Sequence, residues 1–428
     1  MKKENPRAWW KEVKRLCGGQ CNPATLTNHI QAEGVEDLSM KELADAINVT
    51  FLEPLEEYRL PKALSHLPLD DELAEFPEVS ESRIQTTLAK LNPSKACGPD
   101  GIPNWLLKDY AELLAFPITK IINASFKAQR IPRIWKLADV SPLPKTKPVK
   151  NLKKGPRPIS LTACLSKVAE DFIVRDYVKP AVLKILDPYQ YGAVPKSSTT
   201  QALIHMIHNW ANGTDGNGAT VRTILFDYRK AFDLIDHSIL LDKLCKLELP
   251  RSVINWIIDF LSNRLQRIKL ADGCLSEWGS VPQGRKLGPW LFLVLINDLD
   301  LSDNLNADIW KYVDDTTTSE VVTKGNQSNV QPIADCVAQW SYNNRVKLNS
   351  DKCKELRICF ARDQPEFQPI LLNGMNLEVV KSAKLLGVTI TRNLLCNDHI
   401  NDIVKKASKR LYFLVQLKRA KHPLKDLL

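Results

Sequence analysis

The sequence has no hydrophobic run that is long enough to cross a membrane. Its most apolar stretch, Trp290 to Leu299, is far too short and contains Asn297 and Asp298, whereas a transmembrane helix needs about 20 predominantly apolar residues. Residues 1–6 lack the apolar core that would indicate a signal peptide. These two absences argue against membrane integration, and we expect an intracellular protein of the nucleus, the cytoplasm or both.

The sequence also lacks cysteines at the paired spacing of a zinc finger. Its 10 cysteines are mostly scattered singly, and the pair nearest to a histidine is Cys17 and Cys21, with His29 beyond. Irregularly spaced cysteines of this kind are typical of free thiols in a reducing compartment. We therefore predict no structural zinc.

Basic residues, by contrast, are in excess. Lysine and arginine total 59 against 49 acidic residues, which gives a net charge of +10 and an isoelectric point near 9.0. Such an excess is the usual footprint of a surface that binds a polyanion. The alternative is a protein that is merely basic, because charge alone does not separate the two. The chain has 428 residues, 44% of them hydrophobic, enough for two or three domains or subdomains.

Hydrophobic periodicity predicts a mixture of helices and strands, which indicates an α+β core. The predicted helices are 80–91, 103–129, 166–185, 199–210, 237–246, 252–263, one beginning near 289, 332–343, and a last one carrying 400–419. The predicted strands are 138–143, 220–226, 266–270, 309–312, 356–360 and 385–390. Residues up to about 76 mix short helical patterns with prolines, and we expect an extension whose hydrophobic surface packs on something else.

Two of the predicted strands end in aspartates. Asp227 follows the strand 220–226, and Asp314 and Asp315 follow the strand 309–312. Because burying carboxylates without partners is costly, an acid at the end of a buried strand usually has a role. Three carboxylates from adjacent strands could hold two divalent cations about 3.5–4 Å apart, and hard oxygen ligands suit Mg²⁺. The alternative is a solvated turn or a helix cap.

Three motifs around these aspartates resemble those of non-LTR retrotransposon reverse transcriptases. The run 226–233, followed by His237, is similar to the family's first catalytic-aspartate motif. Pro282-Gln283-Gly284 with Leu287-Gly288-Pro289 is similar to the next motif, and Tyr312-Val313-Asp314-Asp315 to the paired-aspartate motif. The three occur in the family's order at plausible separations. The resemblance is to the jockey-like and chicken-repeat-like LINE elements of animals.

The resemblance implies a right-hand polymerase and extends over nearly the whole chain. It divides the sequence into an N-terminal extension or linker that follows a missing endonuclease (1–78), fingers (79–190), a palm with an antiparallel sheet and the catalytic aspartates (191–390) and a partial thumb (391–428). We expect a copy that is truncated at both ends. Further segments that match the family are Asn5-Pro6 with Trp9-Trp10, 98–103, 157–161, Gln190-Tyr191-Gly192 and Leu348-Asn349. Leu386-Gly387-Val388 resembles the family's hairpin that grips the primer.

The family also implies roles for the aspartates and for one aromatic residue. Asp227, Asp314 and Asp315 are the implied catalytic residues and bind two Mg²⁺ ions, or Mn²⁺ in their place. The implied reaction copies an RNA template by adding dNTPs to the 3′-hydroxyl of a DNA primer. Phe232 matches the steric gate, a bulky ring that rejects a 2′-hydroxyl by clash. The alternative for Phe232 is an ordinary core side chain.

Four further residues are implied to bind the incoming nucleotide. Lys145 and Arg157 lie in the segment that contacts the triphosphate in the family, where positive side chains neutralise charge on the transferring phosphoryl group. Gln283 and Gly284 match positions beside the template and the nucleotide, and a glycine permits close backbone approach. The alternative for Lys145 and its basic neighbours is a solvated charge run.

Basic residues late in the chain are implied to bind nucleic acid. Lys352 belongs to the segment that follows the catalytic motif, and Lys405, Lys409 and Arg410 lie on one face of the last helix. Such a face would lie on duplex phosphates without sequence preference and with strong salt dependence. The alternative is a solvated amphipathic surface.

The sequence departs from the family beside the nucleotide. Arg285 and Lys286 follow Pro282-Gln283-Gly284, where the family has a small residue, and Ser280 replaces a usual glycine in a loop that is shorter than typical. These departures leave a second hypothesis open, a catalytically impaired RNA-binding remnant. A third, a polymerase like the group II intron maturases, is disfavoured by the N-terminal linker and by the stretch 226–237.

Overall fold

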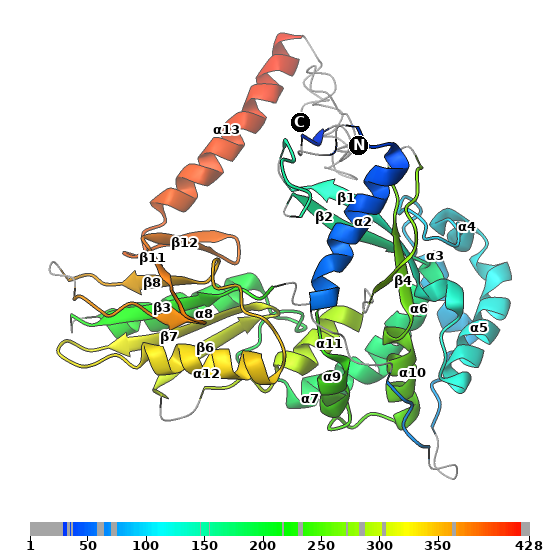
Figure 1. The fold of residues 1–428 in the computed structure, drawn as a ribbon, viewed down its shortest axis with the longest axis horizontal. Helices are drawn as coiled ribbons and strands as arrows, with labels where there is room; N and C mark the ends of the chain where they lie inside the picture. Colours follow the sequence, from blue (N-terminus) through cyan, green and yellow to red (C-terminus); the bar gives the residue numbers. More distant parts are fainter. Residues whose placement is uncertain are drawn as a thin grey trace.

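The computed structural model describes residues 29–31, 35, 37–57, 64–69, 75–145, 147–153, 155–215, 218–229, 234–270, 273–281, 287–301, 305–361 and 365–420. Three of the predicted site residues, Phe232, Gln283 and Gly284, lie outside the described residues, as do Arg285 and Lys286. Helices and strands are mixed throughout these ranges, which confirms the predicted α+β class (Figure 1).

A five-stranded sheet forms the centre of the half of the molecule that carries the aspartates. Its strand order is β11-β8-β3-β7-β6, and all neighbours are antiparallel except β11 and β8. The strands are β3 (Thr220–Phe226), β6 (Ala307–Tyr312), β7 (Asp315–Val322), β8 (Lys354–Ile358) and β11 (Glu378–Val380). The predicted strand 220–226 is therefore confirmed to the residue, as the central strand of this sheet.

Both faces of the central strand are buried, which explains its continuous β-branched and apolar sequence. Since side chains alternate across a strand, Val221 packs on one face with Trp210 of α8 (Thr199–Thr214). Ile224 packs in the larger core that includes Ile333 of α12 (Val330–Asn343). Figure 1 shows these two helices lying along the sheet.

A second sheet has the order β2-β1-β4-β5 and lies against the N-terminal helix α2 (Met40–Glu57). Its strands are β1 (Leu137–Pro144), β2 (Pro156–Thr162), β4 (Arg264–Ile268) and β5 (Gly279–Val281). Leu43 and Ile47 of α2 pack against Val140 and Ile268 in a core of their own. The early segment thus buries its apolar face on a sheet of the same chain.

Hydrogen bonds connect α2 to Glu277, two residues before β5 begins. Asn48 donates from Nδ2 to the carbonyl oxygen of Glu277 at 2.9 Å, and the backbone N–H of Glu277 donates to Asp45 Oδ1 at 2.7 Å. A Cβ at Gly279 would lie 2.2 Å from Leu52 Cδ1, so α2 packs closely on the start of β5. Helix α2 therefore locates the strand that leads to residues 282–286.

Helices from several parts of the chain complete the large core. Most predicted helices are confirmed within a few residues. The helix predicted at 166–185 is interrupted by a π-helical turn, η3 (Val174–Val178). The helices are α3 (Glu81–Ala89), α4 (Asn104–Asp109), α5 (Ala111–Ala128), α6 (Cys164–Ile173), α7 (Lys179–Ile185), α9 (His237–Leu244), α10 (Arg251–Leu261) and α11 (Leu287–Ile296), with a 3₁₀ turn η2 (Arg133–Lys136). No helix in the described ranges is long and apolar enough to span a membrane.

The continuous strand predicted at 385–390 is wrong, because the chain turns back within it, whereas the hairpin that the resemblance implies at Leu386-Gly387-Val388 is confirmed. Leu386 and Gly387 have φ angles of 46° and 93°, a left-handed conformation that ends a strand. The result is a hairpin of β12 (Ser382–Leu385) and β13 (Val388–Thr391). A smaller hairpin joins β9 (Leu371–Leu372) to β10 (Met375–Asn376).

The last helix, α13 (Asn397–Arg419), begins after this hairpin and extends away from the rest of the molecule (Figure 1). The prediction of a helix here is confirmed. Its apolar face is largely exposed: Ile400, Val404 and Leu411 are 52%, 54% and 59% accessible. Helix α13 is therefore amphipathic but covered by little of the described chain.

Candidate active site

The register of the five-stranded sheet brings the aspartates together. Phe226 of β3 pairs with Thr316 of β7, so the next step places Asp227 opposite Asp315. Tyr312 pairs with Asp315 across the β6–β7 hairpin, which leaves Val313 and Asp314 as its two-residue turn. The three carboxylates that the sequence singled out therefore lie close together, where strands β3, β6 and β7 end or begin.

Asp227 is held by the segment between α12 and β8. Asn349 donates from Nδ2 to Asp227 Oδ2 at 3.0 Å, and the backbone N–H of Asn349 donates to the carbonyl oxygen of Asp227 at 2.7 Å. The backbone N–H of Asp227 points to Cys353 Sγ at 3.3 Å, and Lys352 Nζ lies 3.3 Å from Asp227 Oδ2. Sequence reasoning matched Leu348-Asn349 to the family but did not assign Asn349 or Cys353 a role.

The protein raises the pKa of two of the three carboxyls. The pKa of Asp315 is raised to about 6, first because surrounding protein displaces its water and second because Asp314 and Asp227 repel its charge. Partial burial, with a contribution from Asp227, also raises the pKa of Asp314. Such a group of mutually repelling acids is typical of a functional site, since a cation relieves the repulsion.

The donor set fits a hard divalent cation that is shared with a substrate. In the described part of the chain, no three His, Cys, Asp or Glu side chains are grouped closely enough to hold a metal ion by themselves. Mg²⁺ typically takes one or two protein carboxylates and completes its shell with waters and substrate phosphates. Asp227, Asp314 and Asp315, all oxygen donors at one sheet edge, match that requirement.

The raised pKa of Asp315 predicts that metal binding depends on pH. A carboxyl with a raised pKa in the folded state keeps its proton up to about pH 6, so its contribution to stability is present at low pH and is lost as pH rises through about 6. A cation requires the ionised form. We expect the rise in melting temperature caused by Mg²⁺ to be large at about pH 7.5 and nearly absent at about pH 5.

Differential scanning fluorimetry at the two pH values, with and without Mg²⁺, measures this shift. Asp315→Asn is the matched control, because an amide cannot titrate, so its smaller shift should change less with pH than that of the wild type. An equal Mg²⁺ shift at both pH values in the wild type would contradict the assignment.

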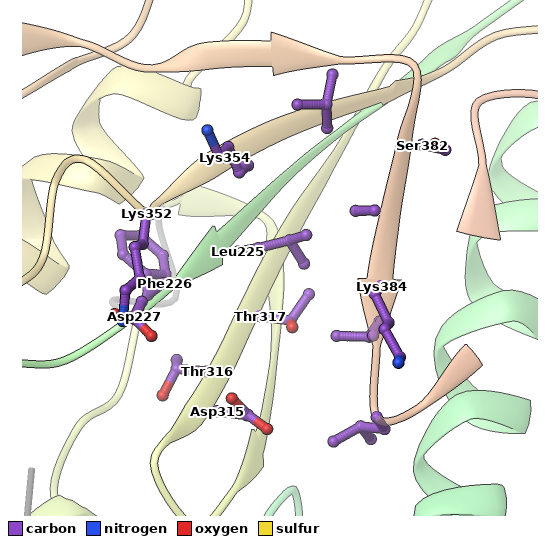
Figure 2. Close-up of a pocket in the computed structure, with 14 residues that line it drawn as sticks. Leu225, Phe226, Asp227, Asp315, Thr316, Thr317, Lys352, Lys354, Ser382 and Lys384 are labelled. Carbon is purple, nitrogen blue, oxygen red and sulfur yellow. Dashed lines mark ion pairs between the residues drawn. The ribbon is translucent and has the colours of Figure 1, made fainter. Parts of the chain in front are cut away.

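A cavity of about 340 Å³ opens beside the carboxylates. Asp227, Asp315 and Thr317 line it from the sheet, and Ser382 and Lys384 line it from β12 of the hairpin. Figure 2 shows Lys384 across from Asp315, with the aspartates at the ends of neighbouring strands. Lys352 and Lys354 also line the cavity on the side of the aspartates, so acidic and basic groups lie together there and Lys384 adds a basic group from the hairpin.

The two predicted triphosphate-binding residues also converge on this region. Leu143 of β1 pairs with Arg157 of β2, so Arg157 and Lys145 are diagonal neighbours on one face of the hairpin. The pKa of Lys145 is lowered, first by partial burial and then by the positive charges of Arg157 and Lys352. Lys352 in turn pairs with Asp227. A group of cations from the β1–β2 hairpin therefore extends to the carboxylates.

The remaining predicted nucleic-acid-binding residues lie elsewhere. Lys405, Lys409 and Arg410 are exposed on α13, which rises from the β12–β13 hairpin that lines the cavity (Figure 1). The structure brings Lys352 to the aspartates and leaves the other three on this separate helix.

The chain belongs to the reverse transcriptase family. The family model described as reverse transcriptase (RNA-dependent DNA polymerase) matches residues 143–390, more than half of the 428 residues. This match confirms the family predicted from the motifs. A second model, described as alkylated DNA repair protein alkB homolog 8, N-terminal, matches residues 396–428 only.

The relatives are polymerases of Drosophila melanogaster mobile elements. The chain is 27% identical over 407 residues to the RNA-directed DNA polymerase from mobile element jockey, an alignment that covers 91% of this chain and 43% of that protein. It is 25% identical over 329 residues to the probable RNA-directed DNA polymerase from transposon X-element, covering 75% of this chain and 36% of the relative. The transposon BS polymerase is 25% identical over 344 residues, covering 77% and 37%. The chain thus spans less than half the length of these relatives.

Proposed function

We propose that this chain is an RNA-directed DNA polymerase that adds dNTPs to the 3′-hydroxyl of a DNA primer on an RNA template during retrotransposition. The observation that carries the proposal is the convergence of Asp227, Asp314 and Asp315 with Lys145, Arg157 and Lys352. Membership of the reverse transcriptase family supports it. A site with carboxylates beside cations suits transfer of a nucleotidyl group, whose charge must be neutralised.

In this proposal the fold is a right-hand polymerase. The fingers are 79–190, the palm is 191–390 and the thumb begins at 391. Support comes from the mainly antiparallel sheet that carries the aspartates and from the β1–β2 hairpin that carries Lys145 and Arg157. The exposed basic residues of α13 would bind duplex phosphates.

Each group of residues has its own task. Asp227, Asp314 and Asp315 would hold two Mg²⁺ ions, or Mn²⁺, which when bound lower the pKa of the attacking hydroxyl and stabilise the leaving pyrophosphate. Asn349 orients the Asp227 carboxylate through its 3.0 Å hydrogen bond. Lys145 and Arg157 would bind the triphosphate, and the cavity between the sheet and the β12–β13 hairpin would take the primer end.

Primer extension tests the proposal directly. The wild-type protein is expected to incorporate dNTPs, in preference to rNTPs, on a primed RNA template in the presence of Mg²⁺ or Mn²⁺. Binding of primed template without extension on any RNA or DNA template would overturn the polymerase proposal and support an RNA-binding remnant.

Lys145→Ala is expected to weaken nucleotide binding. A charge-assisted hydrogen bond contributes about 1.5–3 kcal/mol, so kcat/KM for dNTP should fall roughly tenfold to a hundredfold. Steady-state extension against dNTP concentration measures this. Lys150→Ala is the matched control, since Lys150 is an exposed lysine of the same loop. Equal losses in the two variants would show that the loop contributes only general positive charge.

A further inference from the structure

The turn that carries Asp314 and Asp315 has an unfavourable backbone conformation. Val313 has a φ angle of 60°, in the left-handed region that favours glycine and disfavours β-branched residues. Such a conformation persists only where surrounding contacts impose it. Because Val313 directly precedes the two aspartates, whatever imposes its φ angle also sets where their carboxylates point.

The two-residue β6–β7 turn itself requires a positive φ angle at its first residue, and Gln190 holds the backbone of that turn in place. Gln190 as a whole is 5% accessible, and its Oε1 accepts hydrogen bonds from the backbone N–H of Val313 and from that of Gly192, each at 2.9 Å. A carbonyl oxygen has two lone pairs, so these two donors use the acceptor fully. Loss of the oxygen would leave the Val313 N–H without this partner.

The backbone around Gln190 is itself held against β6. Tyr191 donates from its N–H to the carbonyl oxygen of Lys311 at 2.8 Å, and Lys311 donates back to the carbonyl oxygen of Tyr189 at 2.9 Å. A Cβ at Gly192 would lie 2.5 Å from the backbone nitrogen of Val313, closer than real Cβ atoms approach. The segment therefore lies directly on the turn.

A buried ion pair fixes the other end of this segment. Lys311 Nζ pairs with Asp187, and the lysine side chain is 0% accessible. Asp187 accepts from the N–H of Tyr189 at 2.8 Å and donates its own N–H to Asn297 Oδ1 at 2.9 Å. The position of Gln190 is thus determined by β6 and by the chain that follows α11.

We propose that Gln190 is a positioning residue for the polymerase reaction, which helps to hold Val313 in its left-handed conformation and so fixes the direction of Asp314 and Asp315, the carboxylates that would hold the metal ions. This inference rests on the proposed polymerase function. It assigns Gln190 no contact with substrate. Gln190 acts through its hydrogen bond to Val313. If position 313 held a residue that adopts a positive φ angle freely, Gln190 should no longer be needed.

Gln190→Met tests this, because methionine has a similar length and no acceptor oxygen. The extension kcat is expected to fall roughly tenfold to a hundredfold, since small misplacement of reacting groups costs up to about a hundredfold, while KM for dNTP changes by less than about twofold. Adding Val313→Gly to Gln190→Met should restore most of the lost kcat, because glycine adopts positive φ freely. Gln201→Met, at an exposed glutamine of α8, is the matched control.

Hydrogen exchange measured by mass spectrometry on a peptide covering 307–318 gives a readout that needs no activity. Gln190→Met should speed exchange at this turn, and Gln201→Met should not. Unchanged exchange and kcat in Gln190→Met, or a loss that Val313→Gly fails to restore, would overturn the positioning role. If the wild type itself extends no primer, the polymerase proposal fails, whereas faster exchange confined to Gln190→Met would still support the contact with the turn.

Discussion

Replacing Asp314 by alanine is expected to lower primer extension by at least about a thousandfold, since a bound metal ion supplies several kcal/mol of transition-state stabilisation. Asp314 is in the β6–β7 turn, beside Asp315 and near Asp227. Its loss would remove one of the three carboxylates that we propose to hold the metal ions. The measurement is single-nucleotide incorporation on a primed RNA template in Mg²⁺.

The same variant should fold at least as well as the wild type. The pKa of Asp314 is raised, so its ionised form opposes folding at about pH 7, and that opposition disappears with the carboxyl. The melting temperature without metal should therefore be equal or higher. Asp308→Asn is the control, because Asp308 is an acid of β6 whose pKa is raised by burial, away from the turn. Equal loss of extension in both variants would contradict a specific role for Asp314.

Replacing Lys311 by methionine is expected to destabilise the fold by about 3–5 kcal/mol, the usual result of removing one partner of a buried ion pair. Lys311 has a fully buried side chain that pairs with Asp187, which is 14% accessible. The lysine also donates to the carbonyl oxygens of Leu299 and Ile296 near the end of α11. The variant would leave Asp187 charged and unpaired inside the protein. Urea denaturation followed by circular dichroism measures the change in the free energy of unfolding.

A second substitution separates the charge from the packing. Asp187→Asn added to Lys311→Met removes the unpaired charge and keeps an oxygen for the N–H of Tyr189. The double variant should therefore be more stable than Lys311→Met alone, because most of the single variant's cost is an uncompensated buried charge. If the double variant is no more stable than the single one, the ion pair is not what stabilises this part of the fold.

Features that depend on neighbouring residues were predicted from the sequence, whereas features that depend on contacts between distant residues were mostly missed. The strand 220–226 and the aspartates after it were predicted because apolar periodicity and strand ends are local features. The register that pairs Phe226 with Thr316 is set by tertiary packing, although the order of the motifs already indicated that these strands meet. The strand expected from periodicity at 385–390 was wrong because two positive φ angles turn the chain at Leu386 and Gly387, a hairpin that the resemblance to the family, but not the periodicity, had indicated.

No local sequence pattern indicates the hydrogen bonds that orient the aspartates. Gln190 reaches Val313 across 123 positions, and Asn349 reaches Asp227 across 122. Both belonged to motifs that resembled the family, yet the resemblance did not say which atoms they contact. Helix α2 also had a helical pattern in the sequence, but only its packing against β4 and β5 identified the surface that it covers.

The sequence by itself determined the family and the α+β class, and it singled out the three aspartates as candidates, because each of these inferences depends on residue types and on the order of short motifs along the chain. The tertiary structure alone decided what surrounds the Tyr312-Val313-Asp314-Asp315 turn: the Gln190 acceptor, the Asn349 hydrogen bond to Asp227 and the buried pair of Lys311 with Asp187. The physical reason is that strained or charged groups need partners at hydrogen-bond distance, and folding supplies those partners from distant parts of the chain.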